Sequence, residues 1–374
     1  MLEYIKNTIR AKHVIIIAVN VLCLSAFFVC LALSASIRAP LRNQQAAAAW
    51  AGQSGERFAQ VSVFFPESVE FNEERIHKLR ADVDSALLEA SLESTPRRTL
   101  YTDAWSAEGT VILTDTRGRT VPAKAIGVGG DFFLFHPLYL RDGAYLSPND
   151  VMRDRVVLDE ELAWRLFGAV RIAGFEITIN NIPFVVSGVV ARESDFASSR
   201  AYDDGAGLFM SFEALSEMSD GMASISCYEI VMPDPLTGFA IGVLTDIFSD
   251  SDVHIVENSA RFSLAGSFAA IGSFGERSIM TDTIAFPYWE NAARFAEDWL
   301  ALLLALSLLF IVFPIVSGVI YLVKIIRFIV KQGRKTVSKA IKEHDKREYE
   351  KYLLEHDGEH QIYSVDEIIR EVRD

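Results

Sequence analysis

The sequence predicts an α/β (α+β) extracytoplasmic domain, with an inserted mainly-β subdomain, between two transmembrane α-helices. Two apolar runs carry the membrane prediction: residues 13–37 and 299–323 contain no acidic side chain, lysine or arginine. A helix of about 20 apolar residues is long enough to cross the hydrocarbon core of a bilayer. Residues 38–298 instead mix alternating strand patterns with an amphipathic helix pattern, which is typical of a folded domain.

Basic residues flank both apolar runs on the side away from this domain. They are Lys6, Arg10 and Lys12 before the first run, and Lys324, Arg327, Lys331, Arg334 and Lys335 after the second. Since lysine and arginine favour the cytoplasmic side, residues 1–12 and the tail 324–374 are predicted to be cytoplasmic. The protein is therefore expected in the cell (plasma or inner) membrane as a two-pass protein. We interpret the first run as an uncleaved anchor, because it exceeds the h-region of about 7–15 residues of a signal peptide; cleavage near residues 32–36 is the alternative.

Charge and cysteine content narrow the possible ligands of the domain. The chain has a net charge of −14, and residues 41–298 alone carry −18. Such an acidic domain repels nucleic acid and anionic headgroups, so no nucleic-acid partner is expected. Cys23 and Cys30 lie in the first apolar run, which leaves Cys227 as the single cysteine outside it. The domain must therefore be stabilised by its apolar core, without an internal disulfide.

Two strand–helix–strand units, far apart in the sequence, predict the α/β part. In the first, residues 40–56 are expected to extend the membrane helix as a stalk, 58–65 form a buried strand, and Asn72 caps a helix that ends near Leu92. A hairpin follows, with strands at 109–113 and 121–128 and a turn at Arg117–Gly118. The second unit has strands at 228–232 and 253–256, with a helix between them that begins after Pro233 and Pro235.

Residues 130–226 are predicted to form the inserted mainly-β subdomain. Strands are expected at 155–158, 175–179 and 183–190, and Asn180–Asn181 suits the turn between the last two because asparagine tolerates positive φ. Gly168 is placed to end a short amphipathic helix in the left-handed conformation. These features are folding devices, and none of them is a reactive group.

Several short motifs lie in one order over residues 125–192. Asp131-Phe132-Phe133 follows a glycine-rich strand end, Leu140 to Leu146 contains a turn at Gly143, and Leu162-Ala163-Trp164-Arg165-Leu166-Phe167-Gly168 ends a helix. The strand 155–158 and the hairpin 172–189 complete the series. In this order the motifs resemble the periplasmic core domain of MacB-type ABC exporter permeases, which are relatives of the FtsX-like permeases. The resemblance identifies 38–298 as a MacB-like core domain and covers 13–323 in layout; family members add two further membrane helices, where this chain has the polar segment 324–374.

The chain shows no pattern that predicts catalysis. Gly333-Arg334-Lys335-Thr336 lacks the glycines and the Gly-Lys-Ser/Thr core of a P-loop, and Gly127-x-Gly129-Gly130 does not lead into a dinucleotide-binding helix. The histidines of the domain are isolated, and the cluster His356 to His360 is interpreted as a polar loop rather than a metal site. We therefore predict no catalytic, cofactor-binding or metal-binding residue and no enzymatic activity.

The function follows from the resemblance. It implies a permease-like subunit or accessory of a MacB/FtsX-type ABC transporter assembly, which senses or transmits motion through its extracytoplasmic domain. The implied partners are the lipid bilayer, a cytoplasmic ABC ATPase subunit, and a permease partner or a second copy. A helix from 287 to 299, continuous with the second membrane helix, would couple the domain to it, and 336–354 is predicted to be a cytoplasmic helix. The alternative is a non-transporting sensor or scaffold that binds an extracytoplasmic peptide or lipid-linked ligand.

Overall fold

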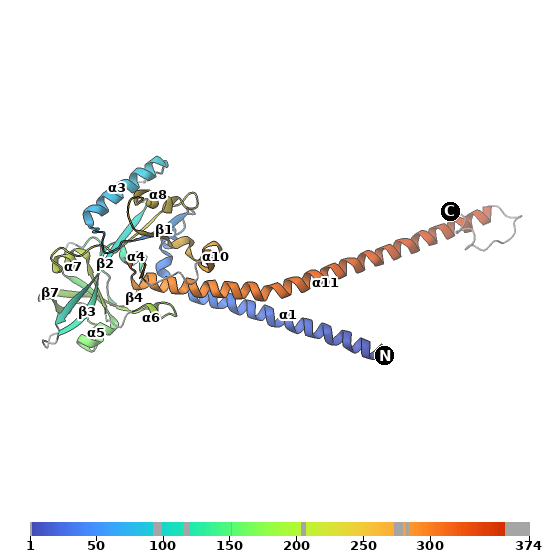
Figure 1. Cartoon of the computed structure of the whole chain (residues 1–374), viewed down its shortest axis with the longest axis horizontal. Coiled ribbons are helices and arrows are strands. Elements are labelled where there is room, and N and C mark those ends of the chain that lie inside the picture. The colour runs from blue at the N-terminus through green and yellow to red at the C-terminus, as the bar shows by residue number, and fades with distance from the viewer. Residues whose placement is uncertain are drawn as a thin grey trace. The chain divides into compact units, whose positions relative to one another are not determined.

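The computed structural model describes residues 2–92, 99–114, 118, 120–150, 152–202, 207–272, 280–281 and 284–355. The predicted turn residue Arg117 and the cluster His356–His360 lie outside these ranges. The chain divides into two compact units, residues 26–308 and residues 1–25 with 309–374. The larger unit contains the sheet domain, and the smaller one contains most of the two long helices (Figure 1).

In the described part of the larger unit, one mixed sheet contains ten strands. Its strand order is β10-β1-β9-β2-β3-β8-β5-β7-β4, and β6 pairs with β2 and β7. The strands are β1 Phe58–Phe64, β2 Thr102–Thr114, β3 Thr120–Gly130, β4 Tyr139–Gly143, β5 Arg155–Asp159, β6 Glu176–Ile179, β7 Ile182–Ala191, β8 Gly207–Ser211, β9 Cys227–Pro233 and β10 His254–Glu257. A separate pair consists of β11 Met280–Thr281 and β12 Ile284–Ala285.

The first half of the sheet interleaves the two predicted strand–helix–strand units. β9 lies between β1 and β2, and β1 lies between β9 and β10, with antiparallel pairing throughout. The connecting helices α3 (Glu73–Glu89) and α8 (Phe239–Ile247) lie side by side (Figure 1). As predicted, the Asn72 side chain caps α3 by accepting a hydrogen bond of 3.2 Å from the Arg75 backbone N–H. The mixed α/β class is therefore confirmed, with the split β-α-β order of a ferredoxin-like sheet.

The second half of the sheet consists of β8, β5, β7 and β4, all from the segment predicted as an insertion. Short helices flank these strands: α4 Phe132–Phe135, α5 Glu160–Phe167, α6 Ser198–Ala201 and α7 Phe212–Met218. Gly168 ends α5 with φ +66°, and Asn180 and Asn181 turn the β6–β7 hairpin with φ of +46° and +67°. β2 begins at Thr102 rather than 109, because its first residues pair with the distant β9. The boundaries of the subdomain remain a prediction.

The prediction of a helical stalk at 40–56 is wrong. The first long helix, α1 (Leu2–Arg38), ends before Pro40, where the residue preceding a proline is disfavoured in a helix. The chain then forms a 3₁₀ turn, η1 (Arg42–Gln44), and the short helix α2 (Ala46–Ala51). Leu41, Gln44 and Ala46 are buried, so this segment packs onto the domain.

Two apolar clusters fill the two faces of the sheet. One includes Val61 and Val63 of β1 with side chains of α3, α5, α7 and α8. The other joins Phe64, Phe132, Phe135 and Trp289 with residues of α2. Phe132 and Trp289 are among the largest fully buried side chains of the described residues. Both faces of the sheet are therefore covered.

The second long helix, α11, runs without interruption from Tyr288 to Glu355. It contains the predicted span 299–323 and the predicted tail helix, as α1 contains 13–37. Both helices are long and apolar enough to cross a membrane. In the smaller unit, Ser317 Oγ donates a 2.8 Å hydrogen bond to Asn20 Oδ1, and His13 Nδ1 lies 2.8 Å from the Tyr321 hydroxyl. Such polar contacts hold apolar helices together where water cannot compete.

Candidate functional site

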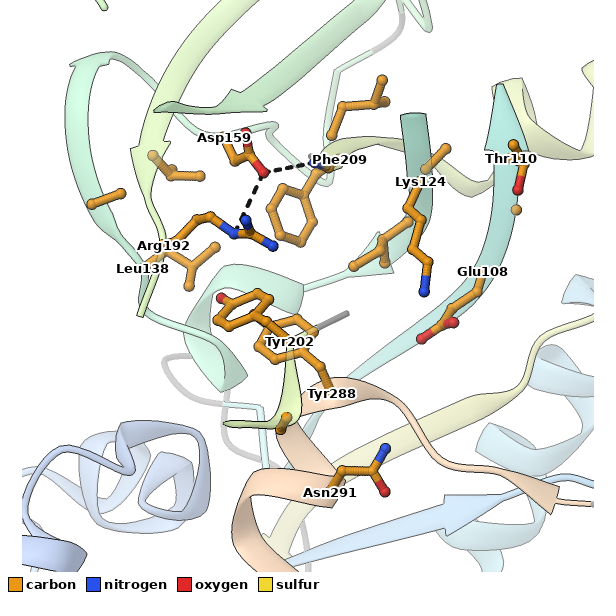
Figure 2. A pocket seen from close by; sticks show the side chains of 18 of the residues that line it. Glu108, Thr110, Lys124, Leu138, Asp159, Arg192, Tyr202, Phe209, Tyr288 and Asn291 are labelled. Carbon is orange, nitrogen blue, oxygen red and sulfur yellow. Dashed lines mark hydrogen bonds and ion pairs between the residues drawn. The ribbon is translucent and has the colours of Figure 1, made fainter. Parts of the chain in front are cut away.

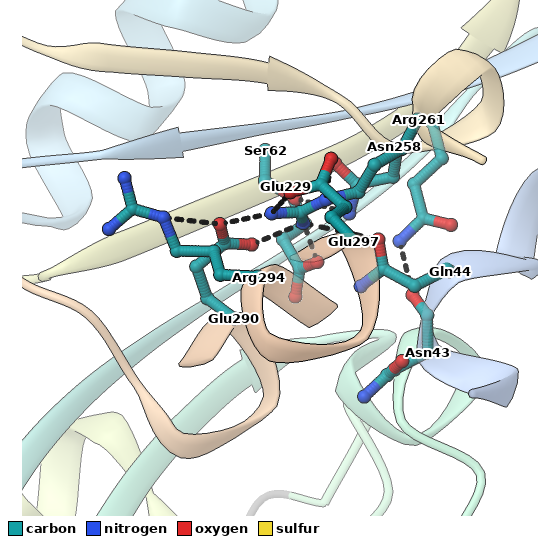
Figure 3. A network of polar contacts seen from close by, with 10 residues as sticks. Asn43, Gln44, Ser62, Glu229, Asn258, Arg261, Glu290, Arg294 and Glu297 are labelled. Carbon is teal, nitrogen blue, oxygen red and sulfur yellow. Dashed lines mark hydrogen bonds and ion pairs between the residues drawn. The ribbon is translucent and has the colours of Figure 1, made fainter. Parts of the chain in front are cut away.

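The start of α11 is held by a buried arginine. Arg261 ends the short helix α9 (Asn258–Arg261), and its Nη1 and Nη2 each donate a 2.6 Å hydrogen bond to the Glu290 carboxylate (Figure 3). One face of α11 also presents Glu297, whose Oε1 lies 2.9 Å from Arg261 Nε. The same face carries Arg294, 3.7 Å from Glu290. Two turns of α11 are thus tied to a single guanidinium.

We call the contacts of Arg261 with Glu290 and Glu297 the Arg261 grip. The balance of its charges makes it strong but sensitive to substitution. Burial alone lowers the pKa of Arg261, but the charges and hydrogen bonds of Glu290 and Glu297 more than reverse that effect, so its pKa is raised and it stays charged. Removing one partner from a buried ion pair costs about 3–5 kcal/mol, since the other charge is left uncompensated. The junction between α9 and α11 therefore depends on all three side chains.

The polar contacts around Arg261 continue, on the same face of the sheet, to the segment that follows α1. We call the buried polar side chains on this face the polar layer. Arg261 Nη1 lies 3.4 Å from Gln44 Oε1, which belongs to η1. Next to it, Gln60 of β1 donates a 2.7 Å hydrogen bond to the Asn43 carbonyl and accepts one of 3.0 Å from the Ala46 backbone N–H. The segment that follows α1 and the start of α11 therefore both contact Arg261, and the former is also hydrogen-bonded to β1.

A second buried charge lies deeper, on β9. Glu229 accepts a 3.0 Å hydrogen bond from Ser62, and its other oxygen lies 2.5 Å from His136 Nε2. The His136 ring packs between Phe132 and Trp289, with ring centroids 4.4 Å apart in each case. Glu229 thus connects the sheet to α4 and, through these rings, to the first turn of α11.

Several polar atoms of this layer have no hydrogen-bond partner among the described residues. They are the side-chain amide of Asn43, His136 Nδ1, Asn258 Oδ1 and Trp289 Nε1. A buried polar group without a partner costs about 1–3 kcal/mol, so native folds contain few of them. These atoms lie in the layer that contacts the start of α11, where a buried water could satisfy them.

A cavity of about 320 Å³ lies on the same side of the sheet, between β2, β3, β7 and α11. Figure 2 shows Arg192 beside Asp159, at 3.8 Å, and beside the Tyr202 ring, whose centroid lies 4.6 Å from the guanidinium. Arg192 also lies 2.6 Å from Glu161. Tyr202 stacks on Tyr288, the first residue of α11, with ring centroids 4.3 Å apart. A ligand in this cavity would therefore contact α11 directly.

Burial raises the pKa of two carboxyl groups in and next to this cavity, Asp159 and Glu193. It raises the pKa of Asp159, although hydrogen bonds from the Gly207 and Leu162 backbone N–H groups and the charge of Arg192 oppose the rise. It also raises the pKa of Glu193, whose Oε2 lies 3.3 Å from the Tyr202 hydroxyl. Among the described residues, no three His, Cys, Asp or Glu side chains gather as metal ligands.

The residues singled out in the sequence take mostly structural places. Phe132 is fully buried, whereas Phe167 is half-buried and packs edge-to-face on Phe175. Trp289, in the helix predicted from 287 to 299, lies in the core, and Cys227 is buried in the same cluster. His136, interpreted as an isolated histidine, is paired with Glu229.

Sequence reasoning missed the Arg261 grip. The signal that could have found it was the spacing of Glu290, Arg294 and Glu297, which places three charges on one face of a helix that enters an apolar span. Gln60 and Ser62 were a second signal, because they interrupt a strand whose other residues are apolar. Neither pattern names its partner, since Arg261 comes from another part of the chain.

Comparison with known proteins gives the family. The model of the MacB-like periplasmic core domain matches residues 16–235. Over 78 residues the chain is 38% identical to the macrolide export ATP-binding/permease protein MacB of Chromobacterium violaceum, which covers 20% of this chain and only 12% of that protein.

Two solved domains show similarity as well. The periplasmic region of MacB from Actinobacillus actinomycetemcomitans is 18% identical, with a TM-score of 0.37, over 53% of this chain and 88% of that one. The extracellular domain of the noncanonic ABC-type transporter YknZ from Gram-positive bacteria is 14% identical, with a TM-score of 0.36, over 53% of this chain and all of that one. In the sequence, an apolar helix precedes the sheet domain and another follows it, as in a membrane protein with an extracytoplasmic domain. Because the family model covers more than half of the chain, the protein belongs to the MacB-like periplasmic core domain family.

Proposed function

We propose that this protein is the membrane component of a MacB/FtsX-type ABC transporter assembly, and that α11 transmits motion between the cytoplasm and the extracytoplasmic domain. The observation that carries the proposal is the Arg261 grip on α11. A helix that is continuous from Glu290 to the cytoplasmic side can move the sheet only if its outer end is fixed to it. The bidentate contact with Glu290 and the contact with Glu297 provide that fixation.

The unsatisfied polar atoms of the same layer support a moving joint. A layer that must adopt two arrangements cannot satisfy every polar group in each of them, whereas a purely structural core can. His136, Asn258 and Trp289 all carry such an atom, and all lie near the first turns of α11 or on α9.

In this proposal the energy comes from a cytoplasmic ATPase; residues 1–374 contain no phosphate-binding loop. In this proposal both termini are cytoplasmic, and a permease partner or a second copy completes the assembly. The relative from Chromobacterium violaceum carries an ATP-binding part in the same protein, as its name states. We expect deletion of residues 336–374 to leave insertion intact but to reduce recovery of the ATPase subunit in a pull-down.

A distance measurement tests the proposal. Full-length protein is purified in mild detergent with its ATPase subunit, and spin labels on Leu236→Cys in the two copies report their separation with ATP and with ADP. We expect an ATP-dependent change that Glu297→Gln diminishes and that Glu217→Gln, an exposed control on α7, leaves intact. An assembly without an ATPase subunit, or a separation insensitive to nucleotide, would contradict the proposal.

The cavity favours a second candidate, a non-transporting sensor or scaffold. Tyr288 of α11 lines the cavity directly, so a bound peptide or lipid-linked ligand could bias α11 without ATP. This candidate predicts that the protein is recovered without an ATPase subunit and that ligand binding depends on Tyr202 and Tyr288. Tyr202→Ala, compared with Tyr139→Ala at an exposed position, separates the two candidates.

A further inference from the structure

Helix α10 (Leu264–Gly272) exposes an apolar stripe. Leu264 is 71% exposed, Phe268 52% and Ile271 36%, and their spacing of four and three residues places them on one side of the helix. Ala270, in contrast, is buried. The helix contains no charged residue, which is unusual for a helix whose outer face is in water. Something apolar is therefore expected to cover this face.

The position of α10 relative to α1 indicates what covers it. Arg38, the last residue of α1, donates a 3.4 Å hydrogen bond from Nη1 to the carbonyl of Phe262, just before α10. Arg38 directly follows the predicted membrane span 13–37, so α10 begins at the level where that span leaves the bilayer. The last turns of α1 also expose Phe28 and Leu33. The apolar surface of α10 thus starts where the lipid-facing surface of α1 ends.

Tight packing fixes α10 in this place. A Cβ atom at Gly266 would lie 2.2 Å from the carbonyl oxygen of Arg261, so only glycine allows α10 to approach α9 this closely. The Gly266 N–H donates a 3.1 Å hydrogen bond to Ser263 Oγ at the start of the helix. Because Arg261 is itself locked to Glu290, the exposed stripe has a fixed orientation.

A second cluster marks the same level beside α11. Phe196 contacts Trp299 and Phe295, with ring centroids 5.4 Å apart in both cases, and the guanidinium of Arg200 lies 4.2 Å from the Phe196 ring. Trp299 is the first residue of the second predicted span, and tryptophan is typical of a membrane–water interface. Two separate segments, around Phe196 and around α10, therefore lie at the heights where the two spans leave the membrane.

We propose that α10 is an interfacial helix, whose Leu264, Phe268 and Ile271 insert into the outer headgroup region of the membrane that α1 and α11 cross. An amphipathic helix lies in this plane when its apolar face is buried at the acyl boundary. Since α10 lacks charges, the contact is hydrophobic and does not require anionic lipid. The inference depends on the membrane placement of α1 given above.

Lipid-depth quenching tests the proposal. Full-length protein, with Cys23, Cys30 and Cys227 replaced by alanine, carries a single NBD-labelled cysteine and is reconstituted into phosphatidylcholine nanodiscs containing doxyl-labelled lipid. The label replaces Phe268 in α10, Phe28 in α1 as the membrane reference, or Leu236 as the aqueous reference, which is 77% exposed before α8. We expect quenching at 268 to be at least twofold above that at 236 and to approach that at 28.

The reference positions keep the outcomes distinct. Quenching at 28 with none at 268 would overturn the inference and leave the membrane placement intact. No quenching at 28 would overturn the placement of α1 and the inference with it. Protection of 268 from aqueous iodide without lipid quenching would mean that protein covers α10, which also overturns the proposal.

Discussion

Alternate side chains of β1 enter two different layers. Val61 and Val63 point to the face covered by α3 and α8, whereas Gln60 and Ser62 point to the face that holds α2, α4 and the start of α11. The first face also contains a buried carboxylate, Asp103. Arg80 donates two hydrogen bonds of 2.7 Å to its two oxygens. The buried carboxylate of the first face is therefore paired, and among the described residues of this apolar cluster the buried side-chain atom without a hydrogen-bond partner is Trp105 Nε1.

The face beside α11 differs in its chemistry. It contains Arg261, Glu229 and Glu290 at full burial, and several of its polar atoms have no partner among the described residues. Directional polar contacts define one arrangement sharply, but they also allow another if the partners are exchanged together. The comparison indicates different roles for the two faces. The face covered by α3 and α8 stabilises the domain, and the face that holds α2 and α4 positions the domain on α11.

The largest expected effect comes from breaking the Arg261 grip. Arg261→Met removes the bidentate partner of the buried Glu290 and the 2.9 Å contact with Glu297, and leaves Arg294 at 3.7 Å from Glu290, so we expect a loss of about 3–5 kcal/mol in the free energy of unfolding. Denaturant unfolding of the full-length protein in detergent, followed by tryptophan fluorescence, measures the loss. The control Arg165→Met removes an exposed i,i+4 pair with Glu161 and should cost less than about 1 kcal/mol. Equal losses would contradict the distinction between a buried grip and a surface pair.

Truncating one phenylalanine on each face compares the two faces by the loss of apolar packing, without a change in charge. Phe132 is buried on the α11 face among His136, Phe209 and Trp289, so Phe132→Ala should cost about 3–5 kcal/mol. Phe167 is half-buried at the edge of the other face, and Phe167→Ala should cost clearly less. The same denaturant midpoints give both values. A larger loss at Phe167 would show that exposure fails to rank these sites.

Local patterns predicted the elements of the fold, and they failed where distant segments decide. The caps at Asn72 and Gly168 and the Asn180–Asn181 turn depend on neighbouring residues alone, and the structure has each of them. The stalk at 40–56 was predicted from composition, but burial against Gln60 overrides helix propensity there. The candidate site could not be predicted, because Arg261 and Glu290 meet only after α9 and α11 are in place.

Titration of Glu193 gives a smaller, pH-dependent effect on the α11 side. Burial raises its pKa above the ordinary 4.5, so the folded protein favours the protonated carboxyl group. Its contribution to stability is present below 4.5 and is lost as the pH rises through the raised pKa. Glu193→Gln should therefore stabilise the protein at neutral pH and remove this part of the slope. The unfolding free energy at a series of pH values measures this effect, with Glu176→Gln at an exposed position as the control; an unchanged slope would contradict the assignment.

The smallest effect is expected at Cys227, which should not react at all. Its side chain is 1% exposed on the α11 face of β9, and burial raises the pKa of its thiol, so the reactive thiolate is scarce. An impermeant maleimide should leave Cys227 unlabelled in folded protein and label it after unfolding. A topology test therefore needs an exposed reporter: Leu236→Cys should react in intact cells, and an engineered cysteine in the tail should react only after lysis. Labelling of the native Cys227 would mean that the α11 face opens to solvent on the timescale of the reaction. The polar layer would then open and close slowly in the folded protein instead of staying closed.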